Sequence, residues 1–184
     1  MTGAVLAGGA GRRLGAASKP GASLGGRPLI WYPIAALSAV CDRVAVVCKP
    51  DTVLPDLDGA ERWDEPEQPR HPIVGIVHAL EHADGPVLVC AADMPFVTSD
   101  ACRTLLAAAG SSPAAVAVAG GILQPVLGLY APAALVVLRD AAEDAALTET
   151  VESLDPARVA LPAALVRSVN TPEELAEAEA TLGR

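Results

Sequence analysis

The chain has 184 residues, of which 52% are apolar, 19% are charged and 3% are aromatic, and its formal net charge is −9. This length predicts one domain over residues 1–184, and the apolar content excludes a disordered chain. The acidic balance argues against nucleic acid or an anionic membrane as a partner, because phosphate-rich surfaces attract basic proteins.

Strand and helix patterns alternate along the chain. In order they predict a strand at 3–7, a glycine-rich loop at 8–26, a helix after Pro28 (delayed or kinked by Pro33), strands at 43–47 and near Trp63, a helix at 73–82, a strand at 86–90, a helix from Thr98 or Ser99 to Gly110, strands at 114–119 and 124–130, a helix opened by Pro132, and a last helix from Pro172 to about Leu182. This alternation is typical of an α/β domain with a mostly parallel sheet. In such sheets, ligands bind beyond the carboxyl ends of the strands.

The stretch from Thr104 to Leu138 contains no charged residue, but glycines and prolines interrupt it repeatedly. It therefore predicts buried strands and turns rather than a membrane span. No hydrophobic signal segment precedes Gly8, and the four cysteines form no CxxC pair. We therefore expect a cytoplasmic protein with reduced, mostly buried thiols and no membrane association.

The strongest local signal is the glycine-rich loop after the first strand. Glycines let backbone N–H groups surround a phosphate, and the basic side chains Arg12, Arg13 and Lys19 add positive charge. The loop is not a dinucleotide-binding fingerprint, because it lacks the last glycine of that motif. It is not a P-loop either, because no Gly-Lys-Ser/Thr follows. The alternative interpretation is a flexible turn with solvated arginines.

The positive charge of the chain is concentrated at its start. Residues 1–41 contain four basic and no acidic side chains, so this segment carries +4 and the remaining residues carry −13. A cationic segment within an acidic protein is suited to a small anionic substrate.

Two further polar residues lie where a site is expected. Asp93 comes just after the strand predicted at 86–90, and an ionised carboxylate there could hold Mg²⁺, which prefers oxygen ligands. The alternative role for Asp93 is that of a turn residue. Asn170 could contact the acceptor or the metal, or could simply precede the predicted helix cap at Thr171.

Several of these segments together resemble one family. The loop Leu6–Lys19 resembles the signature of nucleotidyltransferases with a Rossmann-like fold, and the chain as a whole looks most like the molybdenum-cofactor guanylyltransferases. Other segments that resemble that family are Pro72-Ile-Val-Gly75, Ala92-Asp-Met-Pro-Phe96, Gln124-Pro-Val-Leu-Gly-Leu-Tyr130 and Asn170-Thr-Pro-Glu-Glu-Leu175.

The resemblance implies a single Rossmann-like three-layer domain that transfers GMP from GTP to a molybdopterin-type acceptor and releases pyrophosphate with the help of Mg²⁺. It assigns catalysis to Arg13, Lys19 and Asp93, with Asp93 as the metal ligand. It assigns nucleotide binding to Leu6, Ala7, Gly8, Gly9, Gly11, Arg12, Lys19, Asp64 and Gly75, and the acceptor side to Gln124 and Asn170. A monomer or a small homo-oligomer is expected.

The chain departs from the family pattern at three positions. His71 replaces the first glycine of the segment near the base, Ser18 replaces an aspartate before Lys19, and Gly128 replaces an alanine. The change at His71 bears most on base recognition, so CTP in place of GTP, or another phosphorylated acceptor, stays open as an alternative.

Two other classes of function compete with this interpretation. His78, Glu81 and His82 have the HxxEH spacing of inverted zinc peptidases, and on a helix the two histidines would share a face. The same residues can instead form an exposed polar helix face. A nucleotide-binding regulator without catalysis is the non-enzymatic alternative, and release of pyrophosphate would distinguish an enzyme from it.

Overall fold

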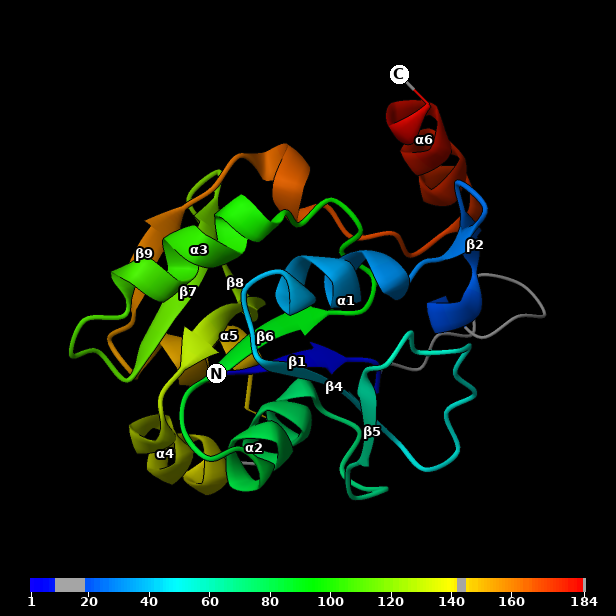
Figure 1. Ribbon diagram of the computed structural model, residues 1–184. Helices are drawn as coiled ribbons and strands as arrows, with labels where there is room; N and C mark the ends of the chain where they lie inside the picture. Colours follow the sequence, from blue (N-terminus) through cyan, green and yellow to red (C-terminus); the bar gives the residue numbers. More distant parts are fainter. Residues whose placement is uncertain (9–18, 142–144, 184) are drawn as a thin grey trace.

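The computed structural model describes residues 1–8, 19–141 and 145–183, and its centre is a seven-stranded sheet (Figure 1). The strands lie in the order β5 (Glu61–Asp64), β4 (Arg43–Cys48), β1 (Thr2–Leu6), β6 (Val87–Ala91), β8 (Ile122–Tyr130), β7 (Ala114–Ala119) and β9 (Ala157–Ala160).

The sheet is mostly parallel. β5, β4, β1 and β6 form a parallel block, and β9 pairs in parallel with β7 at the other edge. β8 is the exception, because it runs antiparallel to both β6 and β7. The predicted α/β fold with a mostly parallel sheet is therefore confirmed.

Helices cover both faces of the sheet. α1 (Trp31–Ser38) and α3 (Ser99–Ala108) pack on one face, and α2 (Pro72–His82), α4 (Leu135–Asp140) and α5 (Leu147–Glu152) pack on the other (Figure 1). Successive strand residues point to opposite faces, so the two apolar layers are built from alternate residues of the same strands. Strands covered on both sides need nearly continuous apolar sequence, which explains the long uncharged stretch.

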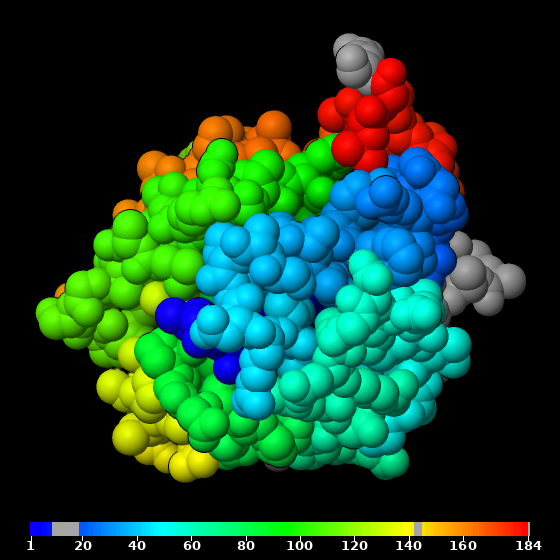
Figure 2. All heavy atoms as spheres, in the orientation of Figure 1, coloured from blue at the N-terminus to red at the C-terminus, as the bar shows by residue number. Residues whose placement is uncertain are grey.

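A smaller unit lies beside the sheet. The hairpin β2 (Ser23–Leu24) and β3 (Arg27–Pro28) packs against α6 (Pro172–Leu182) through a separate apolar cluster that contains Leu24 and Ala178. The red C-terminal helix projects from the body of the molecule in the space-filling view (Figure 2). The predicted helix cap at Thr171 is confirmed, and it is a capping box, since Thr171 and Glu174 cap each other's backbone N–H groups.

The predicted elements are largely recovered. α1 begins at Trp31, so Pro33 lies in its first turn, where a missing N–H costs no helical hydrogen bond. α5 and β9 were not predicted, because both are short and carry charged residues. The uncharged stretch divides among α3, β7, β8 and α4, and no described helix combines the length and apolarity needed to cross a membrane.

The cysteines behave as predicted within this fold. Cys48, Cys90 and Cys102 are buried and Cys41 is half-buried, and none of these four described residues forms a disulfide. Burial raises the pKa of the Cys41 thiol to about 11, so at neutral pH this thiol is protonated and poorly nucleophilic.

Gly128, which replaces the alanine expected from the resemblance, has a steric reason in the sheet. It pairs with Val89 on β6 and with Val116 on β7, next to an irregularity between Val116 and Ala117. A Cβ atom at position 128 would lie 2.9 Å from the carbonyl oxygen of Ala115 and 3.1 Å from Cγ2 of Val116. The close approach of β7 therefore requires a residue without a side chain.

We expect Gly128→Ala to lower the free energy of unfolding by about 1–3 kcal/mol, because the added methyl group must displace backbone atoms of β7. Urea denaturation followed by circular dichroism measures this change. Gly183→Ala is the matched control, since its Cβ would be in ordinary contact at 3.5 Å from the Glu179 carbonyl oxygen. Equal stability of the two variants would contradict the packing argument.

Candidate functional site

A cavity of about 290 Å³ opens at the carboxyl ends of the parallel strands. Its walls come from the residues that follow β1, β5 and β6, from the first turn of α2, and from single residues of β4 and β8. This is the position at which open α/β sheets bind their ligands. Of the described nucleotide-binding candidates, Leu6, Ala7, Gly8, Lys19 and Gly75 line the cavity, as does Asp93.

At one end of the cavity, three predicted residues meet. The ammonium group of Lys19 forms an ion pair with the carboxylate of Asp93, and its Nζ donates a hydrogen bond of 2.7 Å to Oδ1 of Asn170. Lys19 and Asp93 are each about one-fifth exposed, so the pair faces the cavity with little access to bulk water. The structure thus brings together a cation and two oxygen ligands from three distant parts of the chain.

Backbone contacts hold this end in place. The N–H of Val169 donates a 2.8 Å hydrogen bond to the carbonyl oxygen of Asp93, which fixes the segment before α6 against the end of β6. The N–H of Asn170 donates to the carboxylate of Glu174, the same group that completes the capping box. The backbone of Asn170 therefore belongs to the helix cap, while its side chain contacts Lys19.

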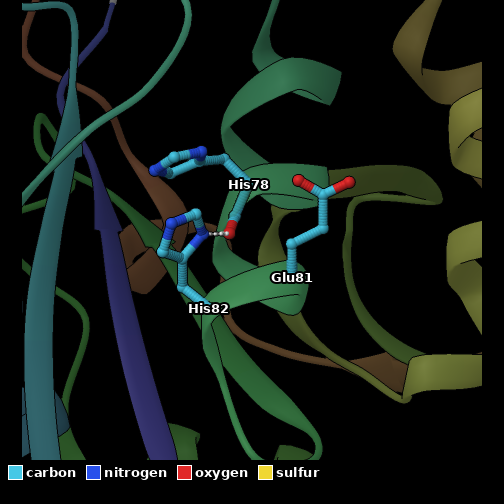
Figure 3. Close-up of side chains that lie close together, drawn as sticks. All are labelled: His78, Glu81 and His82. Carbon is cyan, nitrogen blue, oxygen red and sulfur yellow. Dashed lines mark hydrogen bonds between the residues drawn. The ribbon is translucent and has the colours of Figure 1, made fainter.

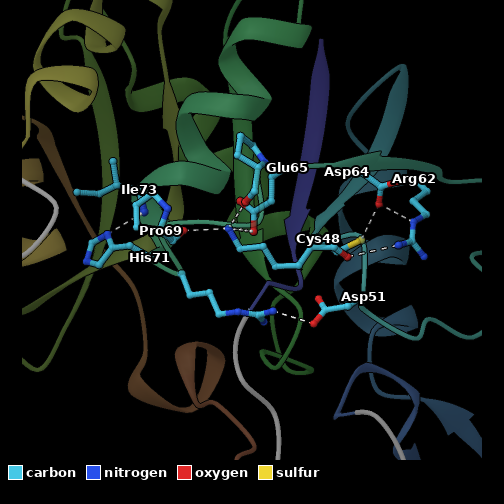
Figure 4. Close-up of polar contacts among 11 residues, drawn as sticks. Cys48, Asp51, Arg62, Asp64, Glu65, Pro69, His71 and Ile73 are labelled. Carbon is cyan, nitrogen blue, oxygen red and sulfur yellow. Dashed lines mark hydrogen bonds and ion pairs between the residues drawn. The ribbon is translucent and has the colours of Figure 1, made fainter.

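At the other end of the cavity lies a buried carboxylate. Glu65 is 4% exposed and lies 3.4 Å from the ammonium group of Lys49, which is 1% exposed (Figure 4). Lys49 also donates hydrogen bonds to the carbonyl oxygens of Pro66 and Pro69. Oε2 of Glu65 is buried and has no hydrogen-bond partner among the described residues. Burial raises the pKa of Glu65, while Lys49 opposes this shift.

Two glycines make room for Glu65. A Cβ atom at Gly8 would lie 2.3 Å from Oε1 of Glu65, and one at Gly75 would lie 3.1 Å from Oε2. The first distance is too short for any side chain at position 8 while Glu65 keeps its place. An unpartnered carboxylate oxygen of this kind costs free energy, which a hydrogen-bond donor on a ligand would recover.

The placement of Asp64 corrects the sequence-based assignment of the acidic residue. Its carboxylate is half-exposed and accepts a 2.8 Å hydrogen bond from Nε of Arg62 (Figure 4). Asp64 does not line the cavity, whereas Glu65 does. Adjacent residues at the end of a strand point to opposite sides of the sheet. A difference of one residue therefore decides whether Asp64 or Glu65 faces the cavity. The acidic pair was visible in the sequence, but its orientation was not.

The first turn of α2 closes the same end. His71 is the N-cap of α2, and its Nδ1 accepts a hydrogen bond of 3.3 Å from the N–H of Ile73. Because Nδ1 accepts, the proton of the neutral imidazole is on Nε2, which makes that atom a donor. His71 lines the cavity, and so does Arg70, which also pairs with Asp51 at 2.7 Å.

The remaining candidates divide into two groups. Gly9, Gly11, Arg12 and Arg13 lie outside the described residues. Gln124 is described but does not line the cavity, and its side-chain amide donates to the carbonyl oxygen of Ile122.

Ser168 and Val126 do line the cavity and were not predicted. Val126 lies two residues beyond Gln124 on β8, and Ser168 lies two residues before Asn170. Val126 therefore belongs to a segment that resembles the family, and Ser168 lies next to another such segment.

Comparison with known proteins identifies the relatives of this chain. The family model "MobA-like NTP transferase domain" matches residues 3–159. A molybdenum cofactor guanylyltransferase of Cereibacter sphaeroides is 33% identical over 99% of this chain and 97% of its own length. A 2-C-methyl-D-erythritol 4-phosphate cytidylyltransferase of Chromobacterium violaceum is 36% identical, over 72% of this chain and 59% of its own length.

Solved structures agree with these matches. The molybdopterin-guanine dinucleotide biosynthesis protein A of Archaeoglobus fulgidus superimposes with a TM-score of 0.77 at 26% identity, over 100% of this chain and 99% of its own. The 2-C-methyl-D-erythritol 4-phosphate cytidylyltransferase of Thermus thermophilus has the same fold, with a TM-score of 0.75 at 23% identity over 98% of each chain. The chain belongs to the MobA-like NTP transferase family.

Proposed function

We propose that this chain is a guanylyltransferase that transfers GMP from GTP to a molybdopterin-type acceptor of the molybdenum cofactor. In this reaction an acceptor oxygen bonds to the α-phosphorus of GTP, and the bond to the β-phosphate breaks to release pyrophosphate. The observation that carries the proposal is the polarity of the cavity. One end has a cation that contacts two side-chain oxygens, and the other end has a buried carboxylate with one oxygen that lacks a partner among the described residues.

The end formed by Lys19, Asp93 and Asn170 suits the triphosphate. Asp93 offers carboxylate oxygens and Asn170 an amide oxygen, which are the hard donors that Mg²⁺ prefers, so these residues fit a magnesium ion. Bound Mg²⁺ would supply charge neutralisation for the phosphates. Lys19 places a fixed cation beside the same point, where negative charge builds up on the departing pyrophosphate.

Arg12 and Arg13, which follow Gly8 in the sequence, stay in the proposal as further cationic groups for the phosphates. The acceptor is then expected beyond Asp93, on the side of Asn170 and Gln124. Ser168 adds a hydroxyl to the wall of the cavity in the same segment as Asn170.

The end formed by Glu65 suits guanine. Guanine presents two adjacent donors, N1–H and the N2 amino group, and an ionised carboxylate can accept both. Cytosine presents one amino donor beside the acceptor N3, which a carboxylate repels. His71 Nε2, as a donor lining the same cavity, complements the O6 acceptor of guanine. These groups favour GTP over CTP, and the apolar side chains Leu6 and Val47 provide walls for the ring.

We expect Lys19→Ala and Asp93→Ala to reduce turnover by about a hundredfold or more, because each removes a charge that acts on the transferring phosphate. The assay is release of pyrophosphate from GTP with Mg²⁺ and a molybdopterin acceptor. Asp100→Ala is the matched control, since Asp100 is an exposed aspartate that pairs with Arg103 on α3. Circular dichroism checks that each variant is folded.

Two results would contradict the proposal. Wild-type rates in the Lys19 and Asp93 variants would remove these residues from the reaction. Binding of GTP by the wild-type chain without any release of pyrophosphate would favour a regulator that retains the fold but not the chemistry.

We expect the affinity for GTP to fall as the pH is lowered through the raised pKa of Glu65, because the protonated carboxyl group loses one acceptor. Glu65→Gln should bind GTP about ten- to a hundredfold more weakly and lose this pH-dependent step, since a charged hydrogen bond contributes about 1.5–3 kcal/mol. Calorimetric titration of GTP at several pH values measures both effects. Asp64→Asn is the control, and the same pH-dependent step in Glu65→Gln would count against the assignment.

A further inference from the structure

Two histidines of α2 form a pair that the proposed reaction does not use. His78 and His82 are four residues apart on one face of the helix, and their ring centroids lie 3.9 Å from each other (Figure 3). Neither ring lines the cavity, which meets α2 at its first turns through Pro72 and Gly75. The pair therefore needs an explanation of its own.

The hydrogen bonding of His82 leaves one ring nitrogen ready to bind a metal. Its Nδ1 lies 2.8 Å from the carbonyl oxygen of His78. A carbonyl oxygen can only accept, so Nδ1 carries the proton and Nε2 of the neutral ring holds a free lone pair. Donation of the second ring N–H to a backbone carbonyl is the arrangement typical of metal-binding histidines, because it fixes the tautomer and the ring orientation.

His78 supplies the second imidazole. Its side chain is half-buried on the same face of α2 as that of His82, and the two ring centroids lie 3.9 Å apart. The pair thus places two possible nitrogen ligands side by side on the helix.

A carboxylate completes the set. One ligand atom from each of His78, Glu81 and His82 lies within 4.8 Å of the others. Around a zinc-sized ion with bonds of about 2.0–2.1 Å, ligand atoms stand roughly 3.3 Å apart, so the ligand atoms must approach one another by at most about 1.5 Å. Glu81 and His82, whose side chains would make this adjustment, are both exposed.

Glu81 has an oxygen to spare. Both hydrogen bonds from Arg139 on α4, at 2.7 and 2.9 Å, reach the same oxygen, Oε1. Oε2 takes no part in that contact. Arg139 nevertheless competes for the charge of Glu81, so its removal should strengthen cation binding.

We propose that His78, Glu81 and His82 form a surface site for one divalent transition-metal ion of the zinc or nickel type. Two imidazoles and a carboxylate suit such ions, whereas the oxygen donors of Asp93 and Asn170 suit Mg²⁺. The two sites therefore select different ions. The proposal concerns binding alone and assigns no peptidase chemistry to the motif.

Calorimetric titration of the full chain with Ni²⁺ tests this site. We expect one equivalent of Ni²⁺ to bind. His78→Ala or His82→Ala should weaken binding at least about tenfold, because even the loss of a residue that only orients a metal ligand reduces metal affinity about tenfold or more. His71→Asn is the matched control, because asparagine also caps helices and His71 is the one remaining histidine. Asp93→Ala should leave Ni²⁺ affinity unchanged, and Arg139→Gln should increase it.

A second readout locates the ion. The ring of Trp63 lies 5.6 Å from that of His82, so bound Ni²⁺ should quench Trp63 fluorescence in a Trp31→Phe background, where no other tryptophan emits. Quenching that saturates with the calorimetric titration supports the site. Absence of saturable Ni²⁺ binding, or full affinity in the double variant His78→Ala/His82→Ala, would overturn the proposal.

Discussion

The contact of Lys19 with Asp93 and Asn170 joins parts of the chain that are 74 and 151 residues apart in sequence. The sheet makes this possible, because β1 and β6 are parallel neighbours whose carboxyl ends lie at one edge. The antiparallel strand β8 begins at that edge, and the chain returns to it before α6 through the hydrogen bond between Val169 and Asp93. The end of the cavity that contains Lys19 and Asp93 therefore depends on the order of the strands in the sheet and on the segment before α6.

The second constraint is the burial of Glu65. A carboxylate that is 4% exposed requires a partner, and Lys49 supplies one while leaving Oε2 unpaired among the described residues. Removing one member of a buried ion pair typically costs about 3–5 kcal/mol, because the other charge is left buried without a partner. Gly8 and Gly75 are small because Glu65 occupies the space between them. Gly8, the first residue of the predicted glycine-rich loop, thus has a steric role.

Lys19 and Asp93 both follow strands whose apolar runs are plain in the sequence. Their place at the same edge of the sheet could therefore be predicted. Asn170 was found through the segment Asn170–Leu175, which resembles the family. The sequence pattern pointed to Asp64 as the acidic residue, whereas Glu65 lines the cavity, because a shift of one residue reverses the side to which a side chain points. β9 and α5 were missed because short segments with charged residues carry weak periodicity. The steric need for Gly128 arises from the spacing of β7 and β8, which sequence patterns do not encode.

The proposed function depends on the orientation of the nucleotide in the cavity. A crystal structure of the chain with GTP and Mg²⁺ measures it directly. We expect N1 and N2 of guanine to lie within about 2.7–3.2 Å of the Glu65 carboxylate and the triphosphate to lie beside Lys19 and Asp93. A base bound at the Asp93 end, or a guanine edge that leaves Oε2 of Glu65 without a partner, would contradict it.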